Sequence, residues 1–186
     1  MARPIEYDQQ IVLDKAMELF WKNSFEGTSV AELVEATGLN KRTMYNLYDD
    51  KQGLFDACLG NYLQKYLMMQ IGFLKNNRGV AGIRQIFSAF EFRNDFIGCL
   101  YVNTAMEKHV LQASSLQIVK NYYNTLKNQV IVNLEQARED GDFTGDSMAV
   151  SLTLLCLAQG INVSGHLNSS DRDCKLIVET ILTLVK

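Results

Sequence analysis

The chain has 186 residues, which is enough to bury a substantial hydrophobic core in one compact unit or two small domains. Hydrophobic residues make up 47% of it and the formal net charge is −3, which excludes a largely disordered chain and a strongly basic nucleic-acid-binding domain. A single proline, Pro4, and few strand-like alternations leave room for long helices, so we expect an all-α fold.

The first expected helix covers residues 7–23, and its inward stripe has helical spacing: Val12, Ala16, Leu19 and Phe20. A second helix begins after Ser29, because Ser29 and Glu32 have the S-x-x-E spacing of a capping box. Gly38 suits the left-handed position that ends a helix, and Asn40 is a good N-cap for a third helix. Two short helices joined by such a tight turn are typical of a helix-turn-helix.

The third helix has two different faces, because successive residues are rotated by about 100°. Its inward side is apolar: Met44, Leu47 and Tyr48. Its outward side is polar and able to hydrogen-bond: Arg42, Thr43, Tyr45 and Asn46. Arg, Asn and Thr side chains can reach base edges in a major groove, while Lys41 and Tyr45 can reach phosphates. An ordinary amphipathic helix hairpin with a solvated outer face is the alternative.

The charge of this region is unusual for a DNA-binding domain. Residues 1–51 carry six basic and nine acidic side chains, a net charge of −3. Three of the cations, Lys41, Arg42 and Lys51, nevertheless lie on or beside the third helix. We expect weak nonspecific binding to DNA, because few cations are available to displace counterions.

The remaining expected helices cover a long segment from Asp49 or Asp50 to residue 75, then 80–90, 99–111, 116–139, 146–167 and 170–185. The last two are the most apolar, although Gln159 and Asn162 interrupt the first of them. A membrane span is the alternative for that helix. Burial against both its own core and a partner copy explains the pattern better.

The start of the chain lacks the apolar core of a signal peptide, so we expect a cytoplasmic protein without a membrane anchor. The four cysteines form no C-x-x-C pair, which favours free thiols over disulfides: Cys58, Cys99, Cys156 and Cys174. Neither histidine, His109 or His166, lies at ligand spacing from a cysteine. We therefore expect no metal site and no cofactor.

Residues 11–59 resemble the N-terminal DNA-binding domain of the TetR family of bacterial transcriptional regulators. The matching residues recur at the family's spacing without a gap: Ala16, Leu19, Phe20, Phe25, Thr28, Ser29, Val30, the turn 36–39, Thr43, Met44, Tyr45, Tyr48, Lys51, Leu54 and Phe55. Ser24 departs from the pattern, because the family usually has Gly there, so the loop before Phe25 is expected to differ in shape. The segment 96–100, with Asn103 and Glu107, more loosely resembles one subset of TetR-like C-terminal domains.

The resemblance implies a helix-turn-helix domain at residues 1–50 and a ligand-binding and dimerisation domain at 51–186. It implies a homodimeric regulator, most simply a repressor, that binds palindromic double-stranded operator DNA and is released by a small-molecule effector of unknown identity. Such a ligand would move the helix from residue 49 to 75 and change the spacing of the two recognition helices. The expected DNA-binding residues are Thr28, Ser29, Asn40, Lys41, Arg42, Thr43, Tyr45, Asn46, Tyr48 and Lys51.

Aromatic and apolar side chains dominate small-molecule pockets, which gives a set of candidate ligand-binding residues: Phe90, Phe92, Phe96, Cys99, Tyr101, Met106, Tyr122 and Tyr123. Core packing is the alternative for each, and Cys99 is either a packed thiol or a sensor. Two other functions stay open. One is an enzyme with Cys99 as nucleophile and His109 as base, although ten residues on a straight helix separate them by about 15 Å. The other is an adaptor protein, which would leave Arg42 and Asn46 without a role.

Overall fold

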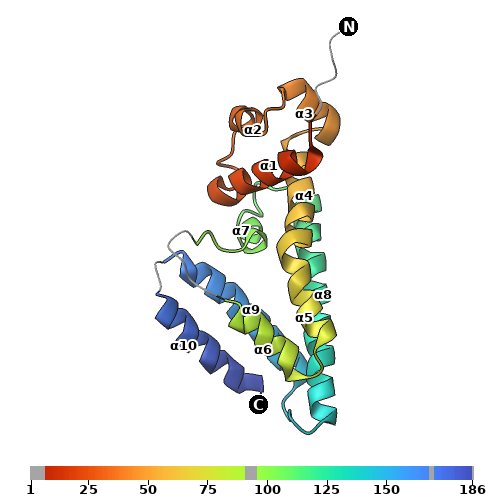
Figure 1. Ribbon diagram of the computed structural model, residues 1–186, viewed down its shortest axis with the longest axis vertical. Coiled ribbons are helices and arrows are strands. Elements are labelled where there is room, and N and C mark those ends of the chain that lie inside the picture. The colour runs from red at the N-terminus through yellow and green to blue at the C-terminus, as the bar shows by residue number, and fades with distance from the viewer. Residues whose placement is uncertain (1–6, 91–95, 168–169, 186) are drawn as a thin grey trace. The chain divides into compact units, whose positions relative to one another are not determined.

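The computed structural model describes residues 7–90, 96–167 and 170–185, and throughout these ranges the regular elements are helices with no strand (Figure 1). This confirms the expected all-α class. The elements are α1 Gln9–Asn23, α2 Val30–Thr37, α3 Lys41–Tyr48, α4 Lys51–Tyr62, the π-helical turn η1 Leu63–Leu67, α5 Met68–Asn76, α6 Val80–Ser88, α7 Leu100–Met106, α8 Ala113–Glu139, α9 Ser147–Gly165, α10 Asp171–Ile181 and the 3₁₀ turn η2 Leu182–Val185.

Local capping sets the ends of the short N-terminal helices. Ser29 and Glu32 form the expected capping box at the start of α2, and Gly38 ends this helix with φ 73°. The Asn40 side chain accepts a hydrogen bond of 2.9 Å from the Thr43 N–H at the start of α3. Asp50 caps α4 in the same way, accepting from Gly53 N–H at 2.8 Å. These bonds satisfy N–H groups that have no partner within their helix.

Two expectations for the later helices were wrong in detail, and the expected long helix contains one irregularity. The helix expected at 99–111 ends at Met106, because the chain turns there, with Glu107 N–H bonded to Thr104 O at 3.2 Å and Val110 N–H to Glu107 O at 3.0 Å. Helix α8 begins at Ala113, earlier than expected. The helix expected from residue 50 to 75 is continuous but contains the π-helical turn η1, in which hydrogen bonds span one residue more than in an α-helix.

The chain divides into two compact units. The first contains the chain up to Lys65 together with Asn103–Val119, and the second contains Tyr66–Val102 and the chain from Lys120 onward. The chain therefore passes from one unit to the other within η1, within α7 and within α8. The first unit includes the predicted helix-turn-helix, and residues 103–119 belong with it despite their distance in sequence.

The core of the first unit forms where α1 packs against α2 and α4 (Figure 1). The Phe55 ring lies 4.9 Å from the Phe20 ring and 5.1 Å from that of Phe25, between ring centroids. Leu33 of α2 and Met44 of α3 are fully buried. Burial of apolar surface stabilises a fold by about 25 cal/mol per Å². This burial fixes the positions of the short helices α2 and α3, which would not be stable alone.

The second unit is held together by packing and by one buried amide. Asn133 of α8 donates to three backbone carbonyls around the α5–α6 turn: Leu74 O at 3.1 Å, Asn77 O at 2.7 Å and Gly79 O at 3.1 Å. Gly82 allows α6 to approach α5, because a Cβ there would lie 2.6 Å from Phe73 O. Helices α9 and α10 contact one another (Figure 1).

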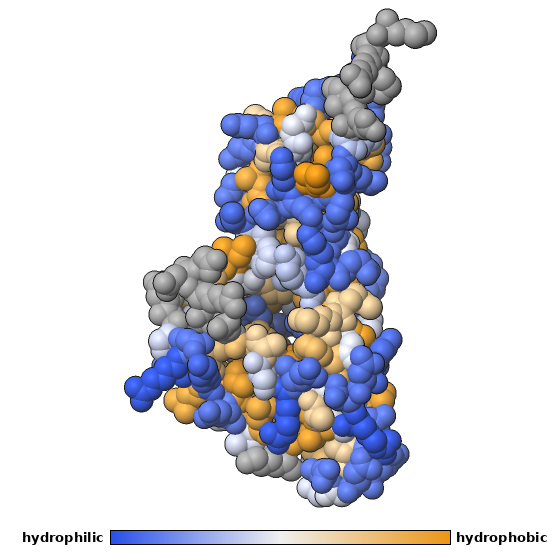
Figure 2. Space-filling view, viewed as in Figure 1, coloured by the Kyte–Doolittle hydropathy of each residue, from blue (hydrophilic) through white to orange (hydrophobic). Residues whose placement is uncertain are grey.

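The outer surfaces of α9 and α10 include exposed apolar side chains. Met148 and Leu152 of α9 are 50% and 48% exposed, and Leu176 of α10 is 63% exposed. Apolar side chains reach the surface between hydrophilic ones in Figure 2. Among the helices of the described residues, α9 alone is long and apolar enough to cross a membrane by length and composition, and only 17% of that apolar stretch is buried. These helices therefore carry apolar surface that their own unit does not cover.

Candidate nucleic-acid interface and effector pocket

Helix α3 presents the polar face that the sequence predicts. Lys41, Arg42 and Asn46 are exposed, and Thr43 and Tyr45 are half-buried beside them. Met44 on the opposite side is fully buried. The buried side of α3 holds the helix in place, and the exposed side displays Arg and Asn side chains. These two types of side chain can make bidentate hydrogen bonds with guanine and adenine, respectively.

The N-terminus of α3 adds positive charge to this face. Its first N–H groups point out of the helix with the positive end of the helix dipole, which favours phosphate. The Lys41 ammonium lies 5.6 Å from the centroid of the Tyr45 ring, so the two predicted phosphate-binding side chains lie together. Leu47, expected on the inward side, is instead 40% exposed.

Two predicted DNA-binding residues are buried in the first unit. Thr28 is fully buried, and its hydroxyl donates to Ser24 O at 2.7 Å. Tyr48 is only 8% exposed, and burial raises the pKa of its phenol. Its position agrees with the helical periodicity that placed it inward. Both residues therefore support α2 and α3 from within the first unit.

The ammonium group of Lys51, a predicted phosphate contact, lies 4.4 Å from the centroid of the Phe25 ring. Partial burial lowers the pKa of Lys51, while the nearby carboxylates of Glu107, Glu26 and Glu32 act in the opposite direction. These charges hold the ammonium group beside the α1–α2 loop. Lys51 therefore packs against the α1–α2 loop and has a structural role there.

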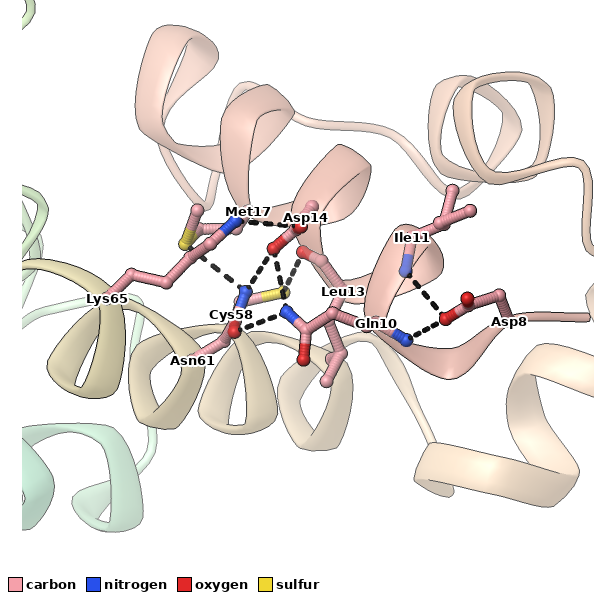
Figure 3. A network of polar contacts seen from close by, with 9 residues as sticks. All are labelled: Asp8, Gln10, Ile11, Leu13, Asp14, Met17, Cys58, Asn61 and Lys65. Atoms are coloured by element: carbon pink, nitrogen blue, oxygen red, sulfur yellow. Dashed lines mark hydrogen bonds and ion pairs between the residues drawn. The ribbon is translucent and has the colours of Figure 1, made fainter.

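A polar network joins α1 to the C-terminal end of α4 and to η1 (Figure 3). Asp14 accepts hydrogen bonds from Gln10 Nε2 at 2.9 Å and Asn61 Nδ2 at 2.8 Å, and forms an ion pair of 2.7 Å with Lys65. Partial burial opposes ionisation of Asp14, but the bonds from Lys65, Asn61 and Gln10 together hold its pKa below the usual value. Sequence patterns do not reveal this network, because α1 contributes Gln10 and Asp14 while Asn61 follows Asp14 by 47 residues.

Residues 103–119 are anchored to the rest of the first unit at two places. At one, the Glu107 carboxylate accepts hydrogen bonds from Phe25 N–H at 2.9 Å and Glu26 N–H at 3.4 Å. At the other, the buried Gln52 side chain of α4 accepts from Gln112 N–H at 3.2 Å and donates to Ser115. The sequence singled out Glu107 only as part of a loose resemblance and gave no sign of its partners.

The second unit contains a small pocket whose free volume, including its open mouth, is about 300 Å³. Its walls come from five segments of this unit: Leu67, Gln70, Phe90, Cys99, Tyr122, Tyr123, Leu126, Ala158, Gln159 and Asn162. Tyr122 Oη donates to Gln70 Oε1 at 2.8 Å. Burial raises the pKa of Tyr122 and of Tyr123, so both are neutral phenols at physiological pH.

Four of the eight predicted ligand-binding residues line this pocket: Phe90, Cys99, Tyr122 and Tyr123. Tyr101 lies behind it, fully buried, with its ring 5.5 Å from that of Tyr122. Phe96 packs on His166 with ring centroids 5.9 Å apart and does not line it. Met106 is 73% exposed and belongs to the first unit, so its placement in the pocket was wrong. Phe92 lies outside the described residues.

Two of the pocket residues are visible in the sequence as polar positions in an apolar helix. Gln159 and Asn162 are the polar interruptions of the apolar helix α9, and both line the pocket. In the sequence they served only as an argument against a membrane span. A polar residue on an otherwise apolar helix is also a sign of a binding site, because amide groups orient a ligand.

The support of α1 and α4, the tight turn at Gly38 and the exposed polar face of α3 define the first unit as a helix-turn-helix DNA-binding domain. Residues 12–58 match the family model described as bacterial regulatory proteins, tetR family. The chain is 30% identical over 197 residues to the HTH-type transcriptional repressor ComR of Escherichia coli, covering 98% of this chain and 90% of that one. The chain belongs to the TetR family and is a transcriptional regulator, not an enzyme.

Other relatives agree over most of the chain. The uncharacterized HTH-type transcriptional regulator YezE of Bacillus subtilis is 25% identical over 169 residues, covering 88% of this chain and 85% of that one. The reduced form of E. coli NemR superposes with a TM-score of 0.84 at 17% identity, covering 95% of this chain and 96% of that one. A CifR cysteine mutant complexed with 26-bp double-strand operator DNA superposes with a TM-score of 0.77 at 23% identity, covering the full length of both chains. These two structures support the same fold.

Proposed function

We propose that the protein is a homodimeric, cytoplasmic repressor that binds a near-palindromic operator through α3 and is released by a small-molecule effector. The observation that carries this proposal is the exposed polar face of α3, centred on Arg42 and Asn46, on a helix-turn-helix whose ends are capped. ComR and BdcR, both relatives from E. coli, are named as repressors, and the CifR mutant was solved with operator DNA.

Dimerisation is supported by the uncovered apolar surface of α9 and α10. Leu152 and Leu176 are about half exposed or more, which is costly in water unless a second surface covers them. A two-fold symmetric dimer presents two copies of α3 to matching half-sites about one helical turn of DNA apart, or a small multiple of it. This assigns the apolar face of α9 to a protein contact in place of a membrane.

The pocket of the second unit is the proposed effector site. Its aromatic walls and its amides, Gln159 and Asn162, are the combination found in small-molecule sites. A ligand releases DNA only if it binds more tightly to the arrangement of helices with the lower DNA affinity. Neither the effector nor repression requires a cofactor in this proposal.

The test is selection of a binding sequence from random DNA by the full chain, followed by titration of wild type and Arg42→Ala on the selected operator. Loss of one bidentate base contact should weaken operator binding by roughly 1–3 kcal/mol and relax specificity at one position of each half-site. Arg84→Ala, a cation of the second unit, is the matched control and should bind as wild type does. Equal affinity of wild type and Arg42→Ala would refute the assignment of α3.

A further inference from the structure

The α1–α2 loop determines where the helix-turn-helix begins. It is short, running from Ser24 to Ser29, and its last residue is the N-cap of α2. Its backbone is fixed by the hydroxyl of Thr28, which bonds to Ser24 O, and by the packing of the Phe25 ring on Phe55. Because α2 contacts α3, a displacement of this loop displaces the surface that faces DNA.

Glu107 holds this loop from a segment 81 residues further along the chain. Its two carboxylate oxygens accept from consecutive backbone N–H groups, those of Phe25 at 2.9 Å and Glu26 at 3.4 Å. Hydrogen bonds to an ionised acceptor are about twice as strong as neutral ones. The Lys51 ammonium, over the Phe25 ring, is attracted to the same carboxylate, so cation, ring and anion form one cluster.

We propose that Glu107 is a positioning residue for operator binding, because it holds the α1–α2 loop in the arrangement from which α2 and α3 face DNA. The inference rests on the proposed function and names a residue outside the helix-turn-helix that this function needs. Without Glu107 the Phe25 and Glu26 N–H groups lose their acceptor, and the loop and α2 are free to leave the arrangement that fits DNA.

The sign of the effect separates this role from a simple charge effect. Glu107 is an anion in the DNA-binding unit, so if only its charge mattered, its removal would strengthen binding to every DNA sequence. As a positioning residue, its removal weakens operator binding. Glu35, an exposed acid on α2, supplies the matched control, because Glu35→Gln removes a negative charge from the same unit without touching the loop anchor.

The experiment titrates wild type, Glu107→Ala, Glu107→Gln and Glu35→Gln on the selected operator and on random DNA at one salt concentration, with amide exchange followed at Phe25. Glu107→Ala should bind the operator about tenfold more weakly, bind random DNA no more weakly, and exchange faster at Phe25. Glu107→Gln keeps one acceptor and should recover part of the affinity. Unchanged operator affinity or unchanged Phe25 exchange in Glu107→Ala overturns the proposal. Failure of the wild type to select any operator refutes the proposed function itself.

Discussion

Replacing Ser24 by Gly should stabilise the protein. Ser24 has φ 70° and ψ 170°, a region of backbone conformation that is almost confined to glycine. Its position directly after α1 requires this conformation, because the chain must turn there towards α2. A non-glycine residue held in such a region costs about 1–3 kcal/mol.

Two losses reduce the gain in stability that Ser24→Gly should give. Glycine increases the backbone freedom of the unfolded chain, which costs about 0.5–1 kcal/mol. The substitution also removes the Ser24 hydroxyl, which accepts a hydrogen bond of 3.2 Å from Gly27 N–H at the surface, worth about 0.5 kcal/mol. The net expectation is a stabilisation of about 1 kcal/mol, or a Tm higher by about 2–4 °C for a chain of this size.

The assay is urea unfolding at fixed protein concentration, with Ser24→Ala as the matched control. Alanine loses the same hydroxyl but keeps a Cβ, so it retains the strain and should be less stable than wild type by about 0.5 kcal/mol. The order of stability should therefore be Gly, then Ser, then Ala. A Ser24→Gly protein no more stable than Ser24→Ala would refute the strain argument.

Leu152→Lys or Leu176→Lys should give a folded monomer with much weaker operator binding, because both side chains are exposed within the unit and each substitution places a charge on the proposed interface. Sedimentation velocity measures the oligomeric state, and a wild type that is monomeric at micromolar concentration contradicts this prediction. Asp14 has a lowered folded-state pKa, so its contribution to stability is present above the unfolded value of 3.8 and is lost as pH falls through the folded value. The difference in unfolding free energy between wild type and Asp14→Asn should accordingly be larger at pH 7 than at pH 2.5, and a difference that does not change with pH would argue against the network of Figure 3.

The helix-turn-helix could be predicted residue by residue because its determinants are local. Ser29, Glu32, Gly38 and Asn40 act within four residues of the backbone groups that they satisfy, so their spacing carries the information. Tyr48 is the residue at which helical periodicity and the family motif lead to different predictions. Helical periodicity placed it inward, the family motif placed it among the DNA contacts, and it is buried.

The anchors of the first unit could not be predicted in the same way. Glu107 bonds to Phe25 across 82 positions and Asn61 to Asp14 across 47, and no periodicity encodes which distant backbone group a side chain meets. The pocket shows the same limit. Aromatic composition identified Tyr122 and Tyr123 but also Met106, because composition does not tell which residues of a helical chain share one unit.

The π-helical turn Leu63–Leu67 has a consequence for how this protein tolerates changes in length. A turn with hydrogen bonds from i to i+5 holds one residue more than an α-helical turn, so the long helix carries a surplus residue at this place. Removing one residue within 63–67 would leave a regular α-helix and keep the faces of α4 and α5 in their present packing. Removing one residue elsewhere in α4, or in α5 before Ile71, would rotate every later side chain of the helix by about 100° and turn the buried Ile71 and Leu74 out of the core. Single-residue deletions along this helix should therefore be tolerated in one short window and nowhere around it.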